Sequence, residues 1–142
     1  MKIRTTLLAA MLAFVGFQAS AQTYGAFTLT SVPAIITAST TTNIGAIIDM
    51  RGSRHVSFTL AGAGVTNAAT QTTMLVAKSV DGVTYESTPS ITLLLTTGSS
   101  GTTATNLDVD VGAVGFLKVV SLATGANTTT NVSVVCSTKP GS

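Results

Sequence analysis

Apolar and polar residues alternate with a period of two along most of this chain. In Val56-Ser57-Phe58 and in Leu107-Asp108-Val109 every second side chain is apolar, which is the pattern of a strand with one buried face. No apolar stripe with the 3.6-residue period of a helix extends far enough to predict one. We expect ten strands, at residues 24–30, 34–39, 44–50, 55–61, 71–80, 83–87, 90–96, 105–111, 115–122 and 129–137.

The breaks between these strands carry turn residues. They fall at 62–64, 81–82, 98–101 and 125–127, which are rich in Gly, Ser, Asn and Asp. Short strands at intervals of about 8 to 15 residues, with no helix between them, are typical of all-β folds. The pattern therefore predicts a single antiparallel β-sandwich or jelly roll of about 8–10 strands.

Asp81-Gly82 lies between two β-rich stretches. This dipeptide favours a two-residue type I′ hairpin, in which both central residues have positive φ. Such a turn places Ser79 opposite Thr84 and Lys78 opposite Tyr85. We expect Asp81 to be present for its tolerance of positive φ rather than as a ligand.

Residues 1–21 have the features of a cleaved signal peptide. Lys2 and Arg4 precede an apolar stretch at residues 7–17, and Ala19-Ser20-Ala21 offers the small residues that a signal peptidase requires. The apolar stretch is short for a membrane core of about 30 Å, so we expect no stable membrane insertion after cleavage. The sequence thus predicts export to the periplasm, the cell surface or the medium, with residues 22–142 forming the β domain.

Removal of residues 1–21 would change the charge. The chain has seven Lys and Arg against five Asp and Glu, and two of the bases are Lys2 and Arg4. The remaining domain is formally neutral, with its charges scattered along the sequence. Nucleic-acid binding needs clustered bases to neutralise phosphates, and we expect none.

Cys136 is the only cysteine. Strand alternation places it on the same face as Val132 and Val134, which predicts a small hydrophobic core residue. An intermolecular disulfide is the alternative for a lone thiol in an oxidising compartment. A lipid anchor is excluded, because the cysteine would have to be the first residue after cleavage.

Two polar patterns are candidate sites for a metal ion or for catalysis. Asn106, Asp108 and Asp110 share one strand face, so Asp108 and Asp110 are candidate Ca²⁺ ligands at a sheet edge, although no calcium-loop motif accompanies them. His55 is the only histidine, and it shares a strand face with Ser57. No nucleophile elbow, zinc ligand set or phosphate loop is present, so we expect no enzyme and no cofactor.

A glycan-binding module is the alternative function. Sugar sites on β-sandwiches use aromatic rings as stacking platforms, and the chain has no Trp. We expect Phe58 and Phe116 in the core, which leaves Tyr24 and Tyr85 as candidate glycan contacts.

The low charge and the abundance of Thr, Ala, Gly and Val favour a structural role. Residues 22–42 hold two short β-rich pieces around Pro33. This extended N-terminal segment either pairs with a neighbour's sheet edge or forms the first strand of its own domain.

Four stretches carry a resemblance to known proteins: residues 48–51, 56–64, 78–85 and 115–120. Together they resemble small β-sandwich proteins of phage particles and uncharacterised exported bacterial surface proteins. The resemblance implies particle decoration or surface display, with no catalytic residues to transfer. From the β-rich, charge-poor composition and the missing catalytic set we expect an exported, non-enzymatic structural or adhesive protein that self-associates as a surface, filament or particle component.

Overall fold

The computed structural model describes residues 25–65, 69–98 and 101–140. Nine strands account for most of this part of the chain. They are β1 (Gly25–Thr28), β2 (Ile35–Ile36), β3 (Thr41–Asp49), β4 (Ser53–Gly64), β5 (Thr70–Ser79), β6 (Ile91–Thr97), β7 (Thr102–Asp110), β8 (Phe116–Thr124) and β9 (Thr129–Pro140). The expected all-β fold is confirmed.

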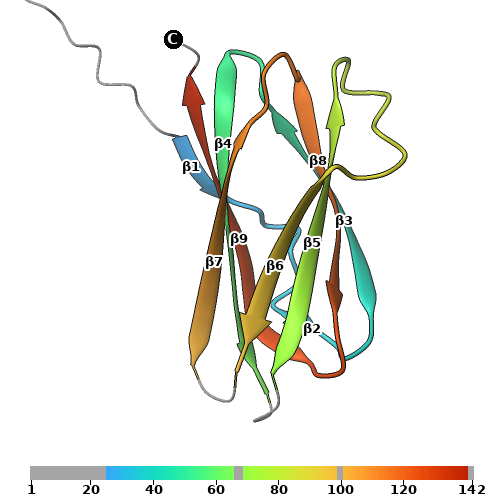
Figure 1. Ribbon diagram of the computed structural model, residues 1–142, viewed down its shortest axis with the longest axis vertical. Helices are drawn as coiled ribbons and strands as arrows, with labels where there is room; N and C mark the ends of the chain where they lie inside the picture. The colour runs from blue at the N-terminus through green and yellow to red at the C-terminus, as the bar shows by residue number, and fades with distance from the viewer. Residues whose placement is uncertain (1–24, 66–68, 99–100, 141–142) are drawn as a thin grey trace, which may run out of the picture.

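The strands form two antiparallel sheets that pack face to face, as Figure 1 shows. One sheet has the order β1-β9-β4-β7, with β2 also paired to β9, and the other has the order β3-β8-β5-β6. If the two-residue β2 is left out and the other eight strands are counted in chain order, the sheets read 1-8-3-6 and 2-7-4-5. This is the order of a jelly roll, in which strands that follow one another along the chain lie in opposite sheets, except β5 and β6, which pair within one sheet.

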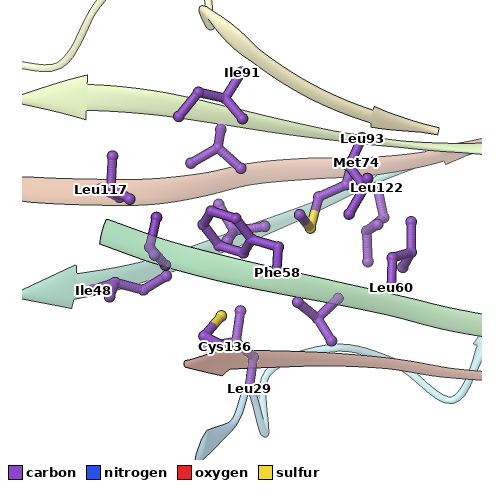
Figure 2. Packing of buried hydrophobic residues seen from close by; sticks show 14 of the residues in the cluster. Leu29, Ile48, Phe58, Leu60, Met74, Ile91, Leu93, Leu117, Leu122 and Cys136 are labelled. Carbon is purple, nitrogen blue, oxygen red and sulfur yellow. The ribbon is translucent and has the colours of Figure 1, made fainter. Parts of the chain in front are cut away.

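The core lies between the sheets and is built by the alternation seen in the sequence. Phe58 is fully buried at its centre, with Cys136 and Leu29 on one side and the side chains of the β3-β8-β5-β6 sheet on the other (Figure 2). Along β6 the alternation is strict, since Ile91, Leu93 and Leu95 are buried while the residues between them are exposed. Phe116 departs from expectation, because it is only half-buried.

Cys136 is fully buried beside Val132 and Val134, as the strand pattern predicted. Burial raises the pKa of its thiol to about 12. The sulfur is enclosed within the fold and is not presented for a disulfide between chains.

The prediction of a type I′ hairpin at Asp81-Gly82 is wrong, and residues 83–87 form no strand. Only Gly82 has a positive φ, of 77°. The Asp81 carboxylate accepts hydrogen bonds from the backbone N–H groups of Val83 (2.9 Å) and Thr84 (2.8 Å), which closes a side-chain turn in place of the hairpin. The residue that lies beside Lys78 also differs from the prediction. The backbone N–H of Glu86, rather than that of Tyr85, donates to the carbonyl of Lys78 (3.1 Å), so the loop is one residue longer than expected.

The described part of the N-terminal segment pairs within its own chain. Strands β1 and β2 both lie along β9, with Phe27 opposite Cys136 and Ile35 opposite Thr130. The predicted signal peptide lies outside the described residues. Those residues include no helix with the length and apolarity needed to cross a membrane.

Candidate functional site

All the acidic and basic side chains of the described residues gather at one end of the sandwich. Strands β3, β5, β7 and β9 finish at this end, and β4, β6 and β8 begin there (Figure 1). The strand register brings the charged residues together, for example by setting His55 between Asp110 and Lys139. We call this the charged end; it holds Asp49, Arg51, Arg54, His55, Lys78, Asp81, Glu86, Asp108, Asp110, Lys118 and Lys139.

Among the described residues, none at the opposite end has a charged side chain. We call it the uncharged end; its described residues are β2 and the connections at 37–40, 65, 69, 98, 101 and 125–128. Ile35 and Val65 are 60% and 59% exposed within it. Between the sheets at this end Thr72 and Thr129 are fully buried, and their hydroxyls hydrogen-bond to each other at 2.9 Å.

At the charged end, opposite charges are held together by turns. The Arg51 guanidinium donates to the Asp49 carboxylate through Nε at 2.9 and 3.0 Å, and this contact lowers the pKa of Asp49 to about 2. The same guanidinium lies 5.0 Å from the centroid of the Phe116 ring. Phe116 is therefore covered by a cation rather than by the core.

The loop between β5 and β6 is fixed by its own carboxylates. Backbone donors from Thr84 and Val83, together with the Ser79 hydroxyl, lower the pKa of Asp81 to about 2. The hydroxyl of Ser90 donates to Glu86 at 2.7 Å and is the main cause of the lowered pKa of that group. As expected, Asp81 serves the turn, although by accepting hydrogen bonds rather than by adopting positive φ.

A hollow of about 290 Å³ lies on the outer face of the β1-β9-β4-β7 sheet, at the charged end. The register explains its lining, because Ser57 lies opposite Asp108 on one side and opposite Ser137 on the other. His55 and Lys139 complete its polar rim. Sequence reasoning placed His55 and Ser57 on one face and Asp108 on another strand, but it could not show that β4 and β7 are neighbours.

The hollow brings together residue types that occur in hydrolase sites, without the contacts of a catalytic relay. Ser57 and His55 are two residues apart on one strand, so their Cα atoms are about 7 Å apart. Among the side-chain hydrogen bonds found in the described residues, none joins Ser57, His55 and Asp108. The arrangement offers hydrogen-bonding groups to a small polar ligand.

The candidate calcium ligands do face solvent, as the strand pattern predicted. Asp110 is occupied, however: it accepts from the backbone N–H of Gly112 (2.9 Å), and its Oδ1 lies 3.7 Å from Arg54 Nε. The hydrogen bond from Gly112 is the largest cause of the lowered pKa of Asp110. The positive charge of Arg54 also lowers this pKa, by a smaller amount. Across the described residues, no third His, Cys, Asp or Glu joins Asp108 and Asp110 in a cluster.

The two candidate glycan contacts have different outcomes. Tyr24 lies outside the described residues. Tyr85 is half-buried, with Lys118 Nζ 5.3 Å from its ring centroid, and its hydroxyl is buried without a hydrogen-bond partner. Lys118 thus covers part of the ring that a sugar would stack on, and glycan binding stays a prediction.

Comparisons with known proteins place this fold among known structures. No protein family profile and no curated protein sequence matches the chain. Among solved structures it is similar to a chain in the structure of infectious bursal disease virus, Gx strain, with a TM-score of 0.53 and 10% sequence identity. The match covers 82% of this chain and 32% of the viral one, so this chain spans about a third of the viral chain's length. The likeness is one of fold.

Proposed function

We propose that this protein is an exported, non-enzymatic structural subunit that self-associates into a surface, filament or particle assembly. The observation that carries the proposal is the separation of charged and uncharged ends. Burying a charged group at an interface costs free energy unless it is paired, whereas Ala, Gly and aliphatic side chains carry no such cost and a Thr hydroxyl costs much less than a charge. The uncharged end is therefore the part of the surface that other copies can cover most readily.

Two further features support this role. Ile35 and Val65 expose large apolar side chains at the uncharged end, and exposed apolar groups gain free energy when a partner covers them. The jelly roll is a fold that virus-particle and lectin domains use, and the similar solved chain comes from a virus structure. Export follows from the signal-peptide features of residues 1–21.

A matched pair of variants tests the proposal. Val65 and Val83 are both exposed, at 59% and 83%, but Val65 lies at the uncharged end and Val83 at the charged end. In size-exclusion chromatography with light scattering, we expect the purified protein to form oligomers whose mass rises with concentration. Val65→Glu should shift the protein toward monomer, and Val83→Glu should leave the mass distribution unchanged.

Two outcomes would overturn the proposal. One is a wild-type protein that stays monomeric at the highest soluble concentration. The other is an equal effect of both glutamates, because the uncharged end would then have no special part in association. Circular dichroism on each variant establishes that the fold is intact, and electron microscopy of the producing cells and their medium tests export and assembly together.

A further inference from the structure

We infer that two copies of this protein join through their β6 strands, which pair antiparallel across a two-fold axis with Leu94 opposite Leu94. This inference rests on the proposed self-association and adds to the uncharged end a second surface through which copies join. The dimer would join two four-stranded sheets, each with the order β3-β8-β5-β6, into one continuous sheet.

Strand β6 is an edge with unused backbone groups. Gln71 of β5 lies opposite Thr96 of β6. The Gln71 carbonyl points away from β6, because it accepts a hydrogen bond from the backbone N–H of Gly125 (2.9 Å). Gln71 and Thr96 are therefore a non-hydrogen-bonded pair, and alternation along the strand turns the backbone groups of Thr92, Leu94 and Thr96 to the open side. Among the described residues, one of these open backbone groups is hydrogen-bonded: the Thr96 carbonyl accepts a long hydrogen bond of 3.4 Å from Thr103 Oγ1.

The other edges of the sandwich carry features that discourage pairing between chains. Strands β1 and β2 have only four and two residues. Strand β3 is interrupted by a bulge between Asn43 and Ala46, with Gly45 at φ 67°. Strand β7 ends in Asp108 and Asp110. Strand β6 has no charge, proline or bulge, so the usual protection of an exposed edge is missing.

The sequence of β6 identifies a second copy as the partner. Residues 92–96 read Thr-Leu-Leu-Leu-Thr, which is the same in both directions about Leu94. Antiparallel pairing about a two-fold axis therefore sets Thr92 against Thr96 and the buried Leu93 against Leu95, so like side chains meet at each position. Leu94, which is 47% exposed, would be covered by its own symmetry mate, and no like charges would meet.

The size of this contact predicts its strength. Seven paired residues extend about 24 Å, and two packed layers make the side of the sandwich about 20 Å wide. Each copy would cover roughly 500 Å², or about 1,000 Å² in total, which is at the lower limit for a specific interface. We expect a transient dimer on its own, which contacts at the uncharged end would reinforce within an assembly.

Cysteine pairs test both the contact and its register, because Cys136, the native thiol, is buried. Opposite residues in a hydrogen-bonded pair have Cα atoms about 5.5 Å apart, within the range of a disulfide. With oxidised glutathione as oxidant, we expect Leu94→Cys to form a covalent dimer. Thr92→Cys and Thr96→Cys should each stay monomeric on non-reducing gels, while an equimolar mixture of the two, one carrying a mass tag, should form the mixed dimer.

Ile47→Cys is the matched control, since Ile47 is 57% exposed on the edge strand β3, which carries the bulge. The inference is overturned if Leu94→Cys cross-links no faster than Ile47→Cys, or if the mixture of Thr92→Cys and Thr96→Cys cross-links no more than either alone. Light scattering on the wild type separates this failure from failure of the proposed function. An oligomeric wild type without the cross-linking pattern refutes pairing through β6 alone, and a strictly monomeric wild type refutes self-association itself.

Discussion

The hydroxyls of Thr72 and Thr129 form a hydrogen bond that joins the two sheets inside the uncharged end. Both side chains are fully buried and their Oγ1 atoms are 2.9 Å apart. No other hydrogen bond to either hydroxyl is found in the described residues. Replacing one threonine by valine keeps the shape and leaves the other hydroxyl buried without a partner.

The expected free energies follow from this geometry. A buried polar group that loses its partner costs about 1–3 kcal/mol, so Thr72→Val and Thr129→Val should each lower the free energy of unfolding by about 2 kcal/mol. The double variant has no unpaired hydroxyl and should lie within about 1 kcal/mol of the wild type. The two single losses sum to about 4 kcal/mol and the double loss is at most about 1 kcal/mol, so the coupling between the two positions is about 3–4 kcal/mol in favour of the double variant.

Urea unfolding followed by circular dichroism measures this cycle. A loss of 2 kcal/mol corresponds to a fall of about 8 °C in Tm for a domain of this size, which gives an independent readout. Thr73→Val, on the half-buried outer face of β5, is the control and should change stability by less than about 0.5 kcal/mol. If the double variant loses the sum of the two single losses, the hydroxyls do not depend on each other and the reasoning is refuted.

Two further predictions concern the loop between β5 and β6. The pKa of Asp81 is about 2 in the fold against an ordinary 3.8, so its carboxylate stabilises the fold above about pH 4 and loses this effect as the pH falls toward 2. Asp81→Ala should therefore lower Tm at pH 7 and flatten the fall in Tm between pH 4 and 2; parallel pH profiles for variant and wild type would contradict this. Tyr85→Phe removes a buried hydroxyl that has no partner and should leave stability unchanged or raise it by about 1 kcal/mol, measured by urea unfolding. A loss of more than 1 kcal/mol would show that the hydroxyl is bonded, and a glycan array with the same variant tests whether Tyr85 contributes to sugar binding.

The sequence was sufficient to predict the class of fold and the faces of its strands. Period-two alternation placed Phe58 and Cys136 inside and Asp108 outside, because a strand with one buried face leaves its pattern in the sequence. The loop at Asp81 was mispredicted because the same residue that tolerates a type I′ turn can also bond to the backbone that follows it, and local pattern does not decide between the two. Strand order could not be predicted, since nothing in the sequence states that β4 lies between β7 and β9.

The charged end shows how a signal can be present in a sequence and still be missed. After residue 21, charged residues fall at 49–55, 78–86, 108–118 and 139, in groups that begin about 30 residues apart. In a sandwich of strands that alternate in direction, the chain returns to the same end after every second strand, which here takes about the same length of chain. Charges that look scattered in the sequence therefore meet in space, and the turns between the groups meet at the other end. In an all-β chain, charged residues that recur after every second strand thus indicate a sandwich whose charges lie at one end. The other end is then the surface to test for contacts between copies.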